Sequence, residues 1–145
     1  MTFEDLRTAI EKGEIDTVLT CIVDMQGRLM GKRLHAEAFL EMARGETHCC
    51  NYLLATDLAM ATPDGYASTS WEAGYGDYVM QPDLTTLRPV PWLDGTAMCL
   101  CDLLDHEDHA PVPFSPRQML KTQIAEASAM GLNPMTATEL EFFLF

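Results

Sequence analysis

Two glutamates near the C-terminal end of the sequence, Glu139 and Glu141, form its sharpest chemical signal. They alternate with apolar residues in the segment 137–145, which predicts a strand with both carboxylates on one face, about 7 Å apart at their α carbons. Paired carboxylates repel each other, and Mg²⁺ or Mn²⁺ removes that cost because these ions prefer hard oxygen ligands. The same alternation is also typical of an amphipathic strand whose glutamates only face water. The pair is therefore a candidate metal site.

A second group of chemically suited residues lies between Trp71 and Trp92, where glycines stand beside aromatic side chains and carboxylates such as Asp77. Glycines allow close approach of a ligand to the backbone, so this stretch suits a loop that binds a small polar or cationic group. The alternative is a packed loop anchored by the two tryptophans. The preceding segment 56–77 is rich in turn-forming residues, and an irregular segment of that length is usually functional or disordered.

The overall charge limits the partners of the chain. Its 145 residues carry a formal net charge of −13, with 48% hydrophobic residues. Such a chain repels phosphate backbones and anionic membranes, so we expect neither nucleic-acid nor membrane binding. No apolar run approaches the ~18 residues of a membrane span, and the N-terminus lacks the apolar stretch of a signal peptide.

Five cysteines are spread along the chain without a C-x-x-C pair. An odd number of thiols in apolar runs predicts buried, reduced cysteines and a cytoplasmic protein. His106 and His109 lie in an acidic stretch bounded by prolines, where we expect exposed loop histidines rather than zinc ligands.

The pattern of apolar residues and turn signals predicts the elements that would position these groups. A helix over 2–12 is expected to start with a capping box made by Thr2 and Asp5, and a hairpin turn is expected at 24–28. Ser115 and Pro116 predict the start of a second-domain helix, with Ser115 as the cap and Gln118 completing a capping box. The remaining expected elements are strands over 16–23 and 29–34, a helix over 36–44 ended by Gly45, strands over 47–55, 78–80, 87–90 and 96–104, and a final strand over 137–145.

Five motifs in order make the chain resemble the N-terminal third of the glutamine synthetase family. They cover residues 14 to 145, and the variant over 87–92 is similar to the branch that includes the γ-glutamyl-polyamine ligases. The motifs are Asp24-Met-Gln-Gly27-Arg28 with Gly31-Lys-Arg33; Gly76-Asp77-x-x-x-x-Pro82-Asp83-x-x-Thr86; Pro91-Trp92-x-x-Gly95-Thr96-Ala97; Ser115-Pro116-Arg117; and Glu139-x-Glu141-Phe-Phe-Leu-Phe145.

The resemblance implies an α+β fold, with a β-grasp domain over 14–108 and the beginning of a catalytic domain over 115–145. Members of the family use ATP to activate the γ-carboxylate of glutamate, and ammonia or a polyamine then attacks the γ-glutamyl phosphate, with Mg²⁺ or Mn²⁺ clamping the phosphates. They work as homo-oligomers with active sites shared between subunits.

The resemblance also assigns roles to individual residues. Glu139 and Glu141 match metal ligands, and Asp77 matches a residue that helps hold the incoming ammonium in the neighbouring subunit. Asp57 lies where a second such aspartate is found, although the usual Asp-Gly-Ser-Ser is Asp57-Leu-Ala-Met60 in this chain. Asp83 is expected to be a turn residue that binds backbone N–H groups.

Most of the family's remaining site would lie beyond residue 145, so we expect this polypeptide to be an N-terminal fragment that is inactive alone. Two rivals differ in class: a stand-alone β-grasp binding module and a plain metal-binding domain. The sequence does not indicate which amine would be used.

Overall fold

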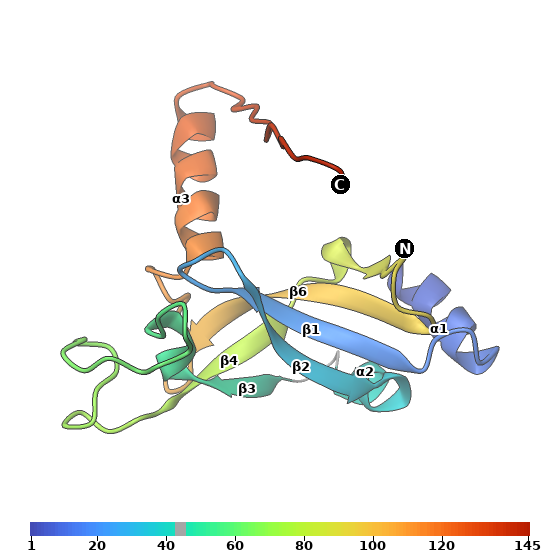
Figure 1. The fold of residues 1–145 in the computed structure, drawn as a ribbon, viewed down its shortest axis with the longest axis horizontal. Coiled ribbons are helices and arrows are strands. Elements are labelled where there is room, and N and C mark those ends of the chain that lie inside the picture. The colour runs from blue at the N-terminus through green and yellow to red at the C-terminus, as the bar shows by residue number, and fades with distance from the viewer. Residues whose placement is uncertain (43–45) are drawn as a thin grey trace.

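A mixed β-sheet forms the centre of the computed structural model, which describes residues 1–42 and 46–145 (Figure 1). Its main path runs in the order β2-β1-β6-β4-β3, with the short strand β5 paired to β6 outside that path. This is the α+β architecture that the sequence predicts. The strands are β1 (Thr17–Val23), β2 (Leu29–His35), β3 (Thr47–Cys50), β4 (Asp77–Pro82), β5 (Arg88–Pro89) and β6 (Thr96–Asp105).

The long strand β6 joins two halves of the sheet. Its first half pairs in parallel with β1, with Thr17 opposite Thr96, and its second half pairs antiparallel with β4, with Tyr78 opposite Asp105. Because β6 is buried along most of its length, its run of small and apolar residues can pack on both faces of the sheet.

Strands β1 and β2 form the predicted hairpin, with Cys21 opposite Gly31. Gly27 adopts φ +80° in the turn between them, which a residue with a β carbon adopts only at a cost. The hairpin turn therefore forms where the sequence places it.

Two helices cover one end of the sheet. The helix α1 (Phe3–Glu11) has the predicted capping box, since Thr2 and Asp5 bond each other's backbone N–H groups, and α2 (Ala36–Met42) follows β2 directly. Leu6 of α1 and Phe39 of α2 are fully buried in one apolar cluster with residues of β1 and β6. The predicted end of the second helix at Arg44 and Gly45 lies outside the described residues.

Two predicted strands are shorter in the structure. The strand predicted over 47–55 ends at Cys50, and a 3-10 helix (Asn51–Leu54) follows. The strand predicted over 87–90 is reduced to the two residues of β5. In both places apolar composition favoured a longer strand, but only residues 47–50 of the first segment and 88–89 of the second pair with a neighbouring strand.

The helix α3 (Pro116–Ala129) stands away from the sheet as a separate projection (Figure 1). Ser115 is its N-cap, but the side chain makes no capping hydrogen bond, so the predicted capping box is wrong. Arg117 fixes the base of the helix instead: it donates to Asp102 on β6 at 2.8 Å and also pairs with Asp83. Leu120 and Ile124 lie exposed on this helix.

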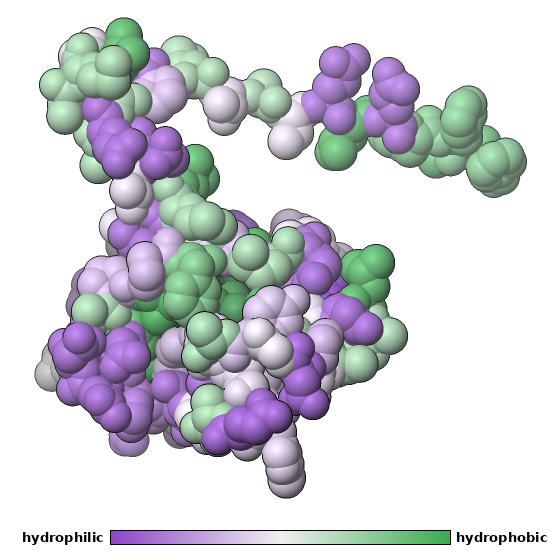
Figure 2. Space-filling view, turned by 90° about the vertical axis from the view of Figure 1, so that its left-hand side faces the viewer, coloured by the Kyte–Doolittle hydropathy of each residue, from purple (hydrophilic) through white to green (hydrophobic). Residues whose placement is uncertain are grey.

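The strand predicted over 137–145 is absent. This segment is irregular and exposed throughout, and Figure 2 shows the C-terminal stretch reaching out clear of the sheet. A strand needs a neighbour that satisfies its backbone N–H and C=O groups, and within the described ranges no strand pairs with these residues. The alternating pattern of the sequence was therefore not sufficient to form the element.

No helix in the described part of the chain is long and apolar enough to cross a membrane.

Candidate functional site

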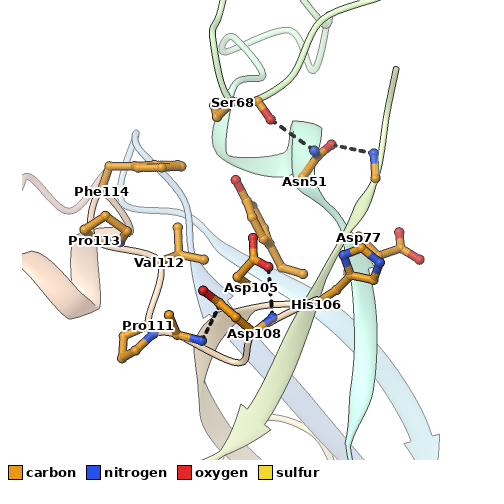
Figure 3. A pocket seen from close by; sticks show the side chains of 13 residues that line it. Asn51, Ser68, Asp77, Asp105, His106, Asp108, Pro111, Val112, Pro113 and Phe114 are labelled. Atoms are coloured by element: carbon orange, nitrogen blue, oxygen red, sulfur yellow. Dashed lines mark hydrogen bonds between the residues drawn. The ribbon is translucent and has the colours of Figure 1, made fainter. Parts of the chain in front are cut away.

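Asp77, the predicted amine-binding residue, is the first residue of β4 and is exposed. It lies at the rim of a pocket of about 370 Å³ between the ends of β3, β4 and β6 (Figure 3). Val112, Pro113 and Phe114 form the apolar wall on the opposite side, and the Asp77 carboxylate points away from that wall. The pocket therefore combines an acidic rim with an apolar wall.

Asn51 holds the chain that leads to Asp77. Its side-chain amide donates to the carbonyl oxygen of Ser68 at 3.1 Å, and its side-chain oxygen accepts from the hydroxyl of Thr69 at 2.9 Å and from Gly76 N–H at 3.3 Å. One side chain thus ties together both ends of the segment 68–76. The sequence analysis missed this residue, because an asparagine after a strand carries no signal of partners 17 to 25 residues away.

Two further carboxylates contribute to the pocket: Asp105 is the last residue of β6, and Asp108 lies in the loop that follows. Asp105 accepts from the N–H of Glu107 at 2.8 Å, and Asp108 accepts from the N–H of Ala110 at 2.8 Å. These hydrogen bonds shape the loop after β6. As predicted, the histidines of this loop are exposed.

Aromatic groups complete the pocket. Tyr78 is buried, only 6% exposed, and its ring meets that of Phe114 edge to face at 6.5 Å between centroids. Burial is the main reason why the pKa of the Tyr78 hydroxyl is raised, so the phenol stays protonated at neutral pH. A protonated phenol, the carboxylates of Asp105 and Asp108 and an apolar wall suit a small organic cation, and the Asp77 carboxylate adds negative charge at the outer rim.

Asp57, the second predicted aspartate, is not among the residues that line this pocket. Its carboxylate oxygen Oδ1 accepts from the N–H groups of Ala59 and Ala61, at 2.8 and 2.9 Å, and so closes a turn over 57–61. The structure therefore gives Asp57 a local turn role and does not bring it together with Asp77.

Asp83 is the turn residue that the sequence predicts, and it has a second partner. It accepts from Thr85 N–H at 3.1 Å, and it also pairs with Arg117 at the base of α3. The hydrogen bond from the Thr85 hydroxyl is the largest influence on the Asp83 carboxyl and lowers its pKa, with Arg117 acting in the same direction.

The predicted metal ligands Glu139 and Glu141 lie in the exposed irregular segment after α3. Among the residues that the structure describes, no group of three or more His, Cys, Asp or Glu side chains converges to hold a metal ion. Mg²⁺ requires near-octahedral oxygen ligation, and two carboxylates on an extended segment do not meet that requirement. Carboxylate oxygens are suitable ligands for a hard cation, but the two glutamates of this chain do not by themselves form a complete metal site.

The cysteines behave as the sequence predicts. All five are free thiols, four of them are buried, and Cys50 is half-buried. Burial raises the pKa of Cys49 to about 12 and also raises that of Cys101, so neither is a reactive thiolate at neutral pH.

The fold is similar to that of solved structures. The structure described as "GmaS/ADP complex-Conformation 1" matches with a TM-score of 0.63 and 26% identity, over 86% of this chain and 25% of that chain. No family model matches the chain.

Three sequence relatives have names that refer to glutamate or γ-glutamyl compounds of amines. The chain is 48% identical over 143 residues to "Gamma-glutamylethanolamide synthetase GlnA4" of Streptomyces coelicolor, which covers 98% of this chain and 31% of the relative. It is 40% identical over 140 residues to "Glutamate--isopropylamine ligase" of a Pseudomonas species, covering 96% of this chain and 30% of the relative. "Gamma-glutamylputrescine synthetase PuuA" of Escherichia coli is 31% identical over 137 residues, covering 90% of this chain and 26% of the relative.

The chain belongs to the glutamine synthetase family, in the branch that includes the polyamine ligases. It spans about a third of the length of the first two of these relatives.

Proposed function

We propose that this chain is the N-terminal part of an ATP-dependent ligase that joins the γ-carboxylate of glutamate to an amine. The observation that carries this proposal is its 48% identity, over 98% of the chain, to a γ-glutamylethanolamide synthetase. A second relative that is named as a glutamate–isopropylamine ligase supports the same acceptor class, an organic amine. Because both relatives are named for the same type of reaction, the comparison does not favour a stand-alone binding module.

The reaction would proceed in two steps that balance without any redox co-reactant. The γ-carboxylate oxygen of glutamate attacks the terminal phosphorus of ATP, which releases ADP and forms γ-glutamyl phosphate. The neutral amine then attacks the carbonyl carbon of γ-glutamyl phosphate, the C–N bond forms, the bond from that carbon to the phosphate oxygen breaks, and phosphate leaves with the former carboxylate oxygen. One proton must leave the amine, so a carboxylate that binds the ammonium form assists this step.

We assign the amine-binding role to Asp77. It is exposed at the rim of an acidic pocket, and the segment before it is fixed by Asn51. A carboxylate in this position attracts an alkylammonium group by charge. Asp57 is a weaker assignment, because its Oδ1 is already used by the turn that follows it.

We infer that residues 14–108 form a β-grasp domain and that residues 115–145 begin a catalytic domain. The support is the sheet order, in which the opening hairpin places β1 beside the parallel, later strand β6. The exposed apolar side chains of α3 and of the segment after it support the second part, because such surfaces are normally covered.

Glu139 and Glu141 would then be two ligands of a Mg²⁺ or Mn²⁺ site that other residues complete. The metal would neutralise phosphate charge. We expect a homo-oligomer in which Asp77 serves the site of a neighbouring subunit, and a cytosolic location where the five free thiols remain reduced.

Two assays test the proposal. A full-length protein that contains this sequence is expected to release phosphate from ATP only when both glutamate and an amine are present, with ammonia, ethanolamine, isopropylamine and putrescine compared as acceptors. The 145-residue chain alone is expected to show no turnover. If no amine supports turnover by the full-length protein, the proposed function is wrong.

Three variants of the full-length protein test the residue roles. Glu139→Gln and Glu141→Gln should each raise the Mg²⁺ concentration needed for activation, because each removes one charge that balances the cation. Asp77→Asn should lower kcat and raise the amine KM while leaving the KM values of ATP and glutamate nearly unchanged. Mixing Asp77→Asn with Glu141→Gln subunits should restore part of the activity, and no recovery in well-mixed oligomers would refute the shared site.

A further inference from the structure

A buried carboxylate organises the turn of the β1–β2 hairpin. Asp24 is only 1% exposed, and its Oδ1 accepts from the N–H groups of Gln26 and Arg28 at 2.9 and 2.8 Å. Its second oxygen, Oδ2, accepts from Nε of Arg28 at 2.6 Å. A buried charge is tolerated only when it is paired and hydrogen-bonded, and Arg28 provides both. The guanidinium is consequently held in one orientation.

From that orientation the guanidinium reaches the segment that follows the 3-10 helix, 30 residues away. Its two terminal nitrogens donate to the carbonyl oxygen of Leu58 at 3.1 Å and to that of Asp57 at 3.0 Å. Gln26 adds a bond from its side-chain amide to the carbonyl oxygen of Thr56 at 3.1 Å. Three consecutive carbonyl groups are therefore bound by two side chains of one hairpin turn.

The bound segment needs to be held. In the turn over 57–61, Met60 adopts φ +64°, a left-handed conformation that costs a non-glycine residue about 1 kcal/mol or more. This turn begins the long irregular segment that leads to Asp77. Asp57 forms hydrogen bonds within the turn itself. Among the described residues, the hydrogen bonds between the turn segment and the hairpin are those made by Gln26 and Arg28. Nothing in the proposed reaction uses Asp24 or Arg28.

We propose that Arg28, fixed by Asp24, is a positioning residue that clamps the segment 56–58 and so sets the start of the amine-binding loop. The role in amine binding rests on the proposed function, whereas the clamp itself rests on the hydrogen bonds. A guanidinium is required, because a lysine at this position keeps the charge but cannot donate to Asp24 and to two carbonyl groups in a fixed fork.

Hydrogen exchange in the 145-residue chain tests the clamp directly. In Arg28→Lys we expect the amides of residues 57–61 to exchange about tenfold faster or more, since charge-assisted hydrogen bonds are lost, whereas the amides of β1 keep their rates. Gln26→Met removes the bond to Thr56 and the bond that Nη2 of Arg28 donates to Gln26 Oε1 at 3.3 Å, but it leaves the bonds of Arg28 to residues 57 and 58, so it should show a smaller increase at the same residues. The matched control is Arg33→Lys on β2, which changes an exposed arginine and should leave the exchange rates of residues 57–61 unchanged.

Kinetics of the full-length ligase test the positioning role. Arg28→Lys should raise the amine KM about tenfold, leave the ATP KM unchanged and leave the unfolding midpoint close to that of Arg33→Lys. Unchanged exchange at residues 57–61 in both Arg28→Lys and Gln26→Met would overturn the clamp. Faster exchange with an unchanged amine KM would overturn the positioning role while the ligase function stands. A full-length protein without ligase activity would refute the proposed function and the amine role together, and the exchange data would still decide the clamp.

Discussion

Replacing Gly31 with alanine should destabilise the hairpin that carries the Asp24–Arg28 pair. A β carbon built on Gly31 would lie 1.8 Å from the carbonyl oxygen of Thr20, 2.9 Å from its carbonyl carbon and 3.0 Å from the α carbon of Cys21. All three atoms belong to the backbone of β1, so no side-chain rotation can relieve the contact. Because β1 and β2 are paired at this point, the added methyl group must push the strands apart.

The size of the effect follows from these distances. The contact must lengthen by about 1.2 Å to reach the 3.0 Å below which such contacts are essentially never found. A separation of that size breaks backbone hydrogen bonds around the Cys21–Gly31 pair, each of which contributes about 1 kcal/mol net. Two lost bonds and the local distortion together predict a loss of about 2–4 kcal/mol in the free energy of unfolding. That is a large part of the ~5–15 kcal/mol typical of a domain.

Urea denaturation followed by far-UV circular dichroism measures this loss. The matched control is Gly76→Ala, where the nearest atom to the added methyl group would be the Asn51 side chain at an ordinary 3.6 Å, and we expect a change within about 0.5 kcal/mol. If Gly31→Ala unfolds at the same urea concentration as the wild type, with the same slope, then the tight approach of β1 and β2 at Gly31 is not a feature of the protein in solution.

Three further predictions concern charge and reactivity. Burial alone would raise the pKa of Asp24, but hydrogen bonds from Arg28 and Gln26 lower it overall. The ionised carboxylate therefore stabilises the folded chain fully above about pH 4, and this stabilisation is lost as the pH falls through the lowered pKa. Urea midpoints measured from pH 6 to pH 2 should fall less steeply in Asp24→Asn than in the wild type. Arg117→Gln removes the bonds from α3 to Asp83 and Asp102, so amides in the first turns of α3 should exchange at least about threefold faster while those of β6 do not, and equal rates would contradict this anchoring. In native protein at pH 8, iodoacetamide should modify the half-buried Cys50 before the buried Cys49, whose pKa is raised to about 12; peptide mass spectrometry gives the order, and earlier labelling of Cys49 would refute it.

Local signals were sufficient for much of the fold. The capping box of Thr2 and Asp5, the turn glycine at 27 and the Pro116 start of α3 all act within a few residues, and each element begins or turns where these residues predict. The cysteines were predicted to be buried because they lie in apolar runs, and four of the five are. The family was also visible from the order of short motifs, and the relatives confirm it.

Elements that depend on distant partners were predicted less well. The Glu139–Phe145 stretch has a regular alternating pattern but forms no strand, because a pattern cannot supply the neighbouring strand that satisfies its backbone. The side chain of Ser115 was expected to cap α3, yet Arg117 anchors the helix through carboxylates on β6 and beside η2, the 3-10 helix Leu84–Thr86. The spacing of residues along the sequence does not predict which distant strand or carboxylate they will pair with.

The sequence by itself determined where several helices and turns begin, that most of the cysteines are buried, and to which family the chain belongs, since these properties arise from local backbone preferences and from residue identity. Only the tertiary structure decided that Asn51 secures the segment before Asp77 and that Arg28 binds the carbonyl groups of residues 57 and 58. Those contacts join positions 25 to 30 residues apart, and they form because chain folding brings a buried carboxylate, a guanidinium and free carbonyl groups within hydrogen-bonding distance.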